Sequence, residues 1–261
     1  MKIVRRISEL GDQGGSVGLV PTMGAFHAGH LALFETARME NDVVVASLFV
    51  NPAQFGANED LARYPRDEER DAKLAEETGV DTLFAPSAEE MYPEGYATWV
   101  DMGELGERLE GEFRPDHFRG VATVCLKLFN IVRPTRAYFG QKDAQQAAVV
   151  KQLVGDLNVG VEIRVVPTVR DSDGLALSSR NAYLSKSERE TALALPRSLW
   201  AGRDAFSAGS DPVREAAALM DGLDVDYLEV ADLDGQKMLA AAVRVGKTRL
   251  IDNVILEGET K

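Results

Sequence analysis

The sequence predicts an α/β protein, with a doubly wound parallel sheet followed by a smaller α+β region. Two observations support this. Over about the first 168 residues, short β-branched apolar runs alternate with helical patterns, the order that is typical of βαβ units. After that point, helices are followed by an antiparallel pair of strands. Because Pro167 and the polar segment RDSDG interrupt the alternation, we divide the chain into residues 1–168 and 169–261.

Hydrophobic patterning places the elements of the first part. The run DVVVASLFV at 42–50 is continuously apolar, which is typical of a strand covered on both faces. A charged helix at 66–78 is expected to end at Gly79. The predicted strands are 16–21, 42–50, 81–85, 97–102, 136–139 and 162–166, and the predicted helices are 29–39, 66–78, 117–132 and 143–154.

The second part has a different pattern. A long helical stretch at 185–208 is interrupted by Pro196, and a second helix is expected at 211–220. A strand at 227–230 precedes two further strands that form a hairpin around Gly246 and Lys247. Helices beside an antiparallel pair predict a small α+β domain.

Composition and charge narrow the class of protein. The formal net charge is −13 and no basic run is longer than two residues, which argues against general nucleic-acid binding. The single cysteine, Cys125, lies in an apolar helical context and is expected to be buried and inert. No signal peptide and no membrane-spanning run are expected, so we predict a cytoplasmic location.

The segment VPTMGAFHAGHLALF contains the strongest candidate site. His27 and His30 lie where a predicted strand leads into a predicted helix, among small residues. Ligands bind open α/β sheets beyond the carboxyl ends of the strands, and a helix start suits phosphate. A well-placed donor to developing charge is worth roughly 2.7–4 kcal/mol, against roughly 0.3–1 kcal/mol for a helix dipole. We therefore expect the imidazoles to dominate, although they would also suit a role in capping the helix.

The spacing His-Ala-Gly-His resembles the HxGH signature of the adenylyl-transferring α/β superfamily. The segments PTMGAFHAGH, SLFVNPAQF, EDLARYPR, HFRGVATV, YFGQKDAQQ, DGLALSSRN and RLIDN occur together in this order. Together they resemble the pantoate–β-alanine ligase (pantothenate synthetase) family over residues 18–253. The resemblance implies a Rossmann-like fold with a small lid domain at 169–261.

The resemblance also implies a reaction. An enzyme of this family condenses (R)-pantoate with β-alanine at the expense of ATP, through a pantoyl adenylate, with release of pyrophosphate and then AMP. The enzyme mainly positions the reactants and neutralises charge. ATP would be a substrate and Mg²⁺ would accompany it. The metal ligands cannot be inferred from the sequence: Asp71 is one candidate, although its acidic helix is more simply a solvent-exposed face.

The family pattern also implies roles for individual residues. His30 is the expected proton donor and His27 a phosphate contact, and Lys142 and Arg180 supply cations. Gln54 is expected to contact pantoate and β-alanine, and Gln146 pantoate. Many relatives have glutamate where this chain has Gln141, so at this position the resemblance implies an ATP contact through the backbone and not through the charge of the side chain. The expected ATP-binding residues are Met23, Gly24, Ala25, Phe26, His27, Ala28, Gly29, His30, Gly140, Gln141, Lys142, Asp143, Val169, Leu177, Ser178, Ser179 and Arg180.

Several alternatives stay open from the sequence alone. The segment 177–180 resembles the mobile KMSKS-type loop of the superfamily, but it would also suit a helix N-cap. His117 and Arg119 belong to the family pattern without a clear role, and capping of the following helix is the default expectation. The family commonly forms homodimers. Two alternatives for the function are a nucleotidylyltransferase, which would form no amide, and a non-catalytic ATP sensor.

Overall fold

A computed structural model describes residues 1–57 and 59–257 of the chain. It divides into two compact units. The first comprises Met1–Gly140 and Val149–Val166, and the second comprises Gln141–Ala148 and the described chain from Pro167 onward. The boundary expected from the sequence, at residue 168, remains a prediction.

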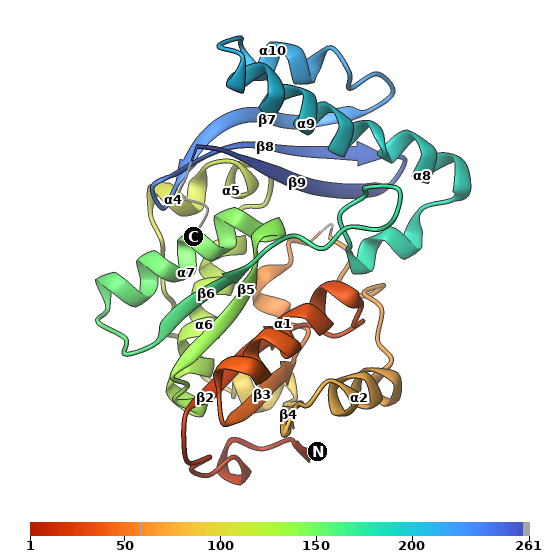
Figure 1. Cartoon of the computed structure of the whole chain (residues 1–261). Coiled ribbons are helices and arrows are strands. Elements are labelled where there is room, and N and C mark those ends of the chain that lie inside the picture. Colours follow the sequence, from red (N-terminus) through yellow and green to blue (C-terminus); the bar gives the residue numbers. More distant parts are fainter. Residues whose placement is uncertain (58, 258–261) are drawn as a thin grey trace. The chain divides into compact units, whose positions relative to one another are not determined.

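The first unit is built on a six-stranded sheet in the order β1-β4-β3-β2-β5-β6, and every pairing is parallel (Figure 1). Its strands are β1 (Lys2–Val4), β2 (Val17–Thr22), β3 (Val43–Leu48), β4 (Thr82–Phe84), β5 (Arg136–Gly140) and β6 (Glu162–Val166). Its α-helices are α1 (Ala28–Glu40), α2 (Glu68–Glu77), α3 (Ala88–Met91), α4 (Glu104–Glu107), α5 (Glu110–Phe113) and α6 (His117–Val132). Helix α7 (Ala144–Asp156) spans both units.

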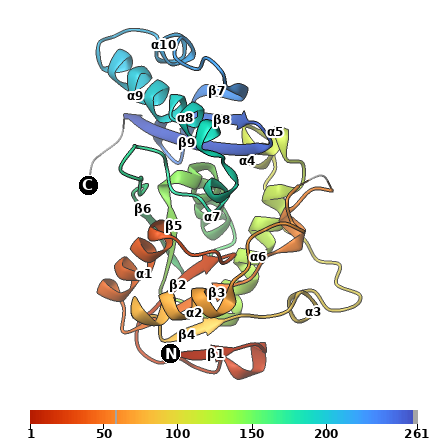
Figure 2. The same ribbon diagram turned by 90° about the vertical axis from the view of Figure 1, so that its right-hand side faces the viewer.

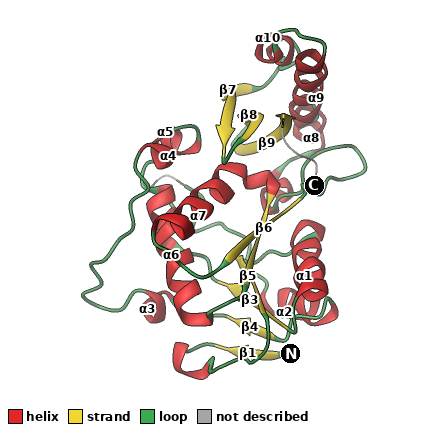
Figure 3. Cartoon of the chain, turned by 60° about the vertical axis from the view of Figure 1, so that its left-hand side comes forward, coloured by secondary structure: helices red, strands yellow, loops and turns green. Residues whose placement is uncertain are grey.

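Helices cover both faces of the central strands. In Figure 3, α1 and α2 lie on one face of the sheet and α6 lies on the other. Val44, Val45 and Ala46 of β3 are fully buried, as a continuous apolar run requires. The predicted doubly wound, Rossmann-like sheet is therefore confirmed.

Strand order identifies the edge of the sheet where a ligand is expected. From β2, the chain builds outward through β3 and β4 on one side, and later through β5 and β6 on the other. Strands β2 and β5 are thus the neighbours at which the order reverses. In open α/β sheets this is where ligands bind, beyond the carboxyl ends of the strands. Here those ends are Thr22 and Gly140.

The second unit has a three-stranded antiparallel sheet in the order β7-β8-β9 (Figure 2). Its strands are β7 (Asp224–Leu233), β8 (Gln236–Val245) and β9 (Thr248–Glu257), and its helices are α8 (Lys186–Ala192), α9 (Ala194–Ser207) and α10 (Pro212–Ala217). Leu195 and Leu199 of α9 share a buried cluster with Leu239 and Ala241 of β8. The predicted hairpin is present, and Gly246 turns it with a φ of 57°.

Three local predictions differ from the structure. Residues 97–102 form no strand, although Val100 N–H donates to Thr123 Oγ1 at 3.0 Å. The long helix is broken at Leu193 and not at Pro196, because proline is tolerated in the first turn of a new helix. Strand β7 extends well beyond the predicted 227–230.

Cys125 is buried in α6, as expected, and burial raises the pKa of its thiol to about 12. Nowhere in residues 1–57 and 59–257 does a helix combine the length and apolarity needed to cross a bilayer.

Candidate functional site

The segment between β2 and α1, which we call the histidine turn (residues 23–30), has an uncommon backbone. Gly24 has a φ of 90° and Ala25 a φ of 53°. The left-handed region is costly for a residue with a Cβ, so Ala25 must be held there by its surroundings. A Cβ at position 24 would lie 2.9 Å from Leu48 Cδ1 and 3.0 Å from Asp71 Oδ2, so a side chain there would also press on both neighbours.

His27 and His30 cap helix α1 through a single ring nitrogen each. His27 is the N-cap, and its Nδ1 accepts the Gly29 N–H at 3.2 Å. His30 Nδ1 accepts the His27 N–H at 3.3 Å, which completes a capping box, and the ring centroids are 4.2 Å apart. Since both Nδ1 atoms accept, the neutral rings carry their hydrogen on Nε2. Helix capping and an Nε2–H group that can donate are therefore compatible in the same two side chains.

Asp71, in the first turn of α2, holds the other side of the histidine turn. Its carboxylate is 1% exposed and accepts the N–H groups of Ala25 at 2.7 Å and Phe26 at 2.8 Å. Burial raises the pKa of the Asp71 carboxyl, and the two N–H donors offset part of that effect. The expectation that the acidic helix is simply solvent-exposed is therefore wrong for this residue. In the described residues, no three His, Cys, Asp or Glu side chains gather to hold a metal ion.

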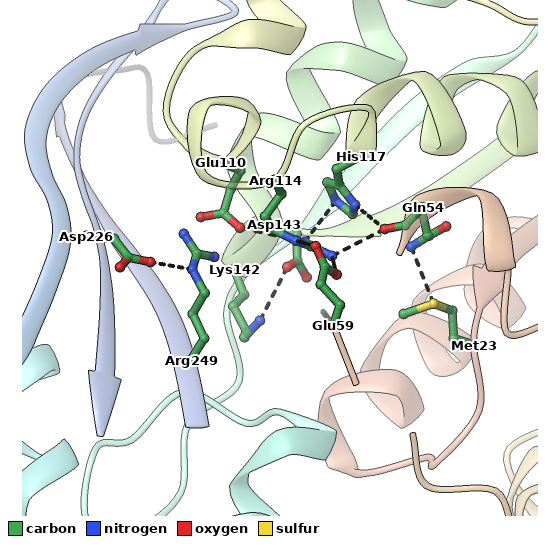
Figure 4. A network of polar contacts seen from close by, with 10 residues as sticks. All are labelled: Met23, Gln54, Glu59, Glu110, Arg114, His117, Lys142, Asp143, Asp226 and Arg249. Atoms are coloured by element: carbon green, nitrogen blue, oxygen red, sulfur yellow. Dashed lines mark hydrogen bonds and ion pairs between the residues drawn. The ribbon is translucent and has the colours of Figure 1, made fainter. Parts of the chain in front are cut away.

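Gln54 lies directly beside the histidine turn (Figure 4). Its Nε2 is 3.3 Å from Met23 Sδ, and its Oε1 accepts from Asn51 Nδ2 at 3.0 Å. Gln54 ends a short 3₁₀ helix, Pro52–Gln54, and is 8% exposed. The structure thus brings one predicted pantoate contact next to one predicted ATP contact within the first unit.

His117 fixes the backbone of Gln54. Arg114 Nη1 lies 3.1 Å from His117 Nε2 and must be the donor, so His117 Nδ1 carries the hydrogen and donates to Gln54 O at 2.9 Å. Arg114 in turn forms a two-bond ion pair with Glu59, with Nη2–Oε2 at 2.7 Å. The expectation that His117 caps α6 is wrong, because Asp116 is the N-cap and His117 faces Gln54.

Arg119 takes no part in holding Gln54. Its guanidinium lies 5.1 Å from the centre of the Trp99 ring, and it forms a long ion pair with Asp116. The same family segment does contribute Gly120, however. A Cβ there would lie 2.3 Å from Ala53 O, so only glycine lets α6 approach the Gln54 backbone so closely.

In the second unit, the segment Gln141–Asp143, which we call the lysine segment, is held by Asn253 of β9. Asn253 Nδ2 donates to the carbonyls of Gln141 at 2.9 Å and Lys142 at 3.0 Å, and its Oδ1 accepts from Gln141 Nε2 at 3.2 Å. The Lys142 ammonium donates to Asp143 Oδ1 at 3.3 Å (Figure 4). Gln146 follows in the first turn of α7 and is half-buried.

The remaining predicted ATP contacts lie close together in the second unit. Leu177 N–H donates to Val169 O at 3.0 Å. Ser178 caps a 3₁₀ helix, Ser179–Tyr183, and its Oγ accepts the Arg180 N–H at 3.3 Å, so the expected N-cap is confirmed. Beside them, Arg170 forms a two-bond ion pair with the buried Asp252, at 2.6 and 2.9 Å.

Sequence reasoning named the residues with ligand chemistry but missed those that hold them. Asp71, Asn51 and Asn253 position predicted site residues, and none was predicted to do so. For Asp71 a signal was available, because it lies four residues before the buried Ala75 on one face of α2. For Asn253, the strand pattern contains no such signal.

The fold and the histidine turn are typical of one class, the nucleotide-binding α/β proteins, which bind their ligands at the switch point of a parallel sheet. The family model described as pantoate-beta-alanine ligase matches residues 1–255. The chain belongs to the pantoate–β-alanine ligase family.

Relatives of known sequence and structure agree with this assignment. The pantothenate synthetase of Moorella thermoacetica is 55% identical over 94% of this chain and 92% of its own length. The pantothenate synthetase structure from Thermus thermophilus has a TM-score of 0.96 at 47% identity, covering 99% of this chain and 100% of that one. The Francisella tularensis pantoate–β-alanine ligase, complexed with β-γ ATP and β-alanine, has a TM-score of 0.85 at 36% identity and covers 99% of each chain.

Proposed function

We propose that this chain is an ATP-dependent ligase that condenses (R)-pantoate with β-alanine to form pantothenate. The pantoate carboxylate attacks the α-phosphorus of ATP and pyrophosphate leaves. The amine of β-alanine then attacks the carbonyl of the pantoyl adenylate and AMP leaves. The first step is needed because a free carboxylate has a poor leaving group, whereas an acyl phosphate has a good one.

The observation that carries this proposal is the paired arrangement of His27 and His30. Both rings start the same helix, and the backbone occupies both Nδ1 atoms, so that the hydrogen of each neutral ring is on Nε2. We assign His30 as the donor to the phosphate oxygens and His27 as a phosphate contact. Such a donor is worth roughly 2.7–4 kcal/mol where charge develops in a transition state.

Roles for the other site residues follow the same chemistry. Gln54 is proposed to contact pantoate and β-alanine, and Gln146 pantoate, because an amide both donates to a carboxylate and accepts from a hydroxyl or an amine. Lys142 and Arg180 are proposed to supply positive charge to the phosphates. The proposed ATP contacts are those predicted in the segments 23–30, 140–143 and 177–180 and at position 169.

Other elements of the proposal concern the setting of the enzyme. Mg²⁺ is proposed to accompany ATP, since this ion keeps several waters and binds largely through substrate phosphates. The described residues offer no ready-made three-ligand site, so we assign it no protein ligand and derive no step through it. A homodimer, a cytoplasmic location, and a division into an ATP- and pantoate-binding domain (1–168) and a lid domain (169–261) complete the proposal.

The order of substrate requirements tests the proposal. Purified protein is incubated with ATP and Mg²⁺, then with pantoate, then with β-alanine, while pyrophosphate, AMP and pantothenate are measured. We expect pyrophosphate release to require pantoate, and AMP and pantothenate to form only after β-alanine is added. Transfer of AMP to a phosphate-bearing acceptor without amide formation would indicate a nucleotidylyltransferase, and ATP binding without turnover would indicate a sensor.

A further inference from the structure

We propose that Asp71 is a positioning residue for the transfer step. Its carboxylate holds the N–H groups of Ala25 and Phe26, and thereby sets the turn from which His27 and His30 present their Nε2–H groups. This inference rests on the proposed role of the two histidines and assigns Asp71 no contact with substrate.

The burial of Asp71 is the first argument. Helix α2 is rich in charged side chains, and Glu68, Glu69 and Arg70 beside Asp71 are all exposed. Asp71 alone among these four is buried, and each of its oxygens accepts one N–H of the histidine turn. A buried carboxylate is costly unless it is hydrogen-bonded, whereas an apolar residue would fill the same space without that cost. The presence of a carboxylate at this buried position is therefore explained by its hydrogen bonds to the two N–H groups, and not by a need to fill space.

The second argument is a continuous series of contacts from Asp71 to the imidazoles. The backbone of Phe26 is held on both sides, because its N–H donates to Asp71 and its carbonyl accepts from Arg70 Nη2 at 3.1 Å. The buried Phe26 ring lies 5.4 Å from the His30 ring. The next N–H along the chain, that of His27, donates to His30 Nδ1. A change in the backbone torsions of Phe26 would therefore disturb both rings.

The third argument is the conformation that Asp71 stabilises. Ala25 has positive φ, which a residue with a side chain rarely adopts without support. The Ala25 N–H is bonded to Asp71 at 2.7 Å, which provides that support at the same residue. Without this bond, the turn would be free to relax toward an ordinary conformation, and the N-cap geometry of His27 would change with it.

The Asp71→Asn variant tests the proposal. The N–H groups of Ala25 and Phe26 each need one acceptor atom, and the asparagine amide offers only its single oxygen. Its NH₂ group, itself a donor, would face the second N–H group. The readout is the long-range ¹H–¹⁵N spectrum of the imidazoles, which is simple because the chain has only three histidines. In the native protein, His27 and His30 should show the Nε2–H form and His117 the opposite, Nδ1–H form, with signals assigned by single-histidine substitutions.

In Asp71→Asn we expect the His27 and His30 signals to lose the uniform Nε2–H pattern, while His117 is unchanged. The kcat for pyrophosphate release should fall about 10²-fold, since small misplacement of a catalytic group has effects of this size. The KM for β-alanine should be unchanged. Asp71→Glu, which keeps the charge but moves it by one methylene group, should not restore kcat.

Lys73→Gly is the matched control, because it weakens the same helix at an exposed position that does not contact the turn. It should lower the Tm but leave the imidazole spectrum and kcat unchanged. The proposal is overturned if Asp71→Asn behaves like this control. If the His27 and His30 signals shift in Asp71→Asn but the native protein releases no pyrophosphate, then Asp71 positions the rings and it is the ligase assignment that fails.

Discussion

The histidine turn and the lysine segment follow two neighbouring strands, β2 and β5, but they are held by opposite chemistry. In the histidine turn, the backbone presents N–H groups, and a buried carboxylate, Asp71, accepts them. In the lysine segment, the backbone presents carbonyls, and a neutral amide, Asn253, donates to them. The backbone groups left without partners thus determine which side chain can hold each segment.

The comparison extends to Gln54, whose carbonyl is also held by donors, His117 and Arg114. The direction of these hydrogen bonds sets the tautomers of the three histidines. His27 and His30 accept N–H groups at Nδ1, whereas His117 donates from Nδ1 to a carbonyl. The same residue type therefore accepts backbone N–H groups in one place and donates to a backbone carbonyl in another.

The largest expected effect tests whether the histidine turn supplies the reactive donor. His30→Ala should lower kcat for pyrophosphate release roughly 10²–10³-fold, because a donor to developing charge is lost. It should also destabilise the fold by about 0.5–2 kcal/mol, since the capping box is broken. His30→Gln keeps a side chain that can complete the capping box, and should restore stability in urea unfolding but not kcat. Activity within a few-fold of native in His30→Ala would remove His30 from the chemistry.

A smaller effect is expected from the support of the lysine segment. Asn253→Leu removes two donors from the carbonyls of Gln141 and Lys142, and should lower the free energy of unfolding by about 1–3 kcal/mol. Asn253→Asp should cost more, because a carboxylate would face two carbonyl oxygens. Asn130→Ala, at an exposed amide that bonds within its own helix, should change stability by only about 0.5 kcal/mol. An equal effect of Asn253→Leu and the control would mean that the lysine segment does not depend on this amide.

The smallest effect concerns Glu59, which orients Arg114 behind Gln54. Burial alone would raise the pKa of Glu59, but the Arg114 hydrogen bond and charge hold it below its usual value of 4.5. A lowered pKa means that the carboxylate stabilises the fold above that pH, and that this contribution is lost as the pH falls below 4.5. Glu59→Gln should therefore be less stable than the native chain at pH 7, by about 1 kcal/mol. This difference in stability between Glu59→Gln and the native chain should shrink toward zero as the pH falls below 4.5.

Urea unfolding of both proteins between pH 7 and pH 3.5 measures this difference. Glu77→Gln is the control, because Glu77 lies in an exposed, long ion pair with Lys73. Its stability difference from the native chain should be near zero at every pH. A Glu59→Gln difference that persists unchanged at low pH would show that Glu59 acts through packing and not through its charge.

Patterns along the chain predicted the elements whose burial is uniform. The run at 42–50 contains β3, and its continuous apolar character reflects the cover on both of its faces. The turn with two histidines was predicted in the right place, between a strand of the sheet and the helix that follows it. Strand β7 was underestimated, because its first residues include Asp224 and Asp226, and aspartate is depleted in strands. The strand expected at 97–102 is absent, because that segment pairs with no other strand.

Candidate ligand contacts could be predicted from the family pattern, whereas the residues that hold these candidates in place depend on tertiary contacts. Asn253 lies 111 positions from Lys142 along the chain, and Asp71 lies 45 positions from Phe26. Hydrogen bonds between such distant positions leave no periodic signal in a single sequence. The opposite tautomer of His117 is likewise set by Arg114 and by the Gln54 carbonyl, which only the folded chain brings together.

The burial of Cys125 has a practical consequence. The chain's one native sulfhydryl is shielded in α6 and is scarcely ionised near neutral pH. A second cysteine engineered on the surface would therefore be the sole group to react with maleimide dyes or spin labels, without prior removal of the native one. Exposed positions such as Met39 on α1 and Leu219 after α10 would accept such labels, one for each unit, and so allow distances to be followed by fluorescence during turnover.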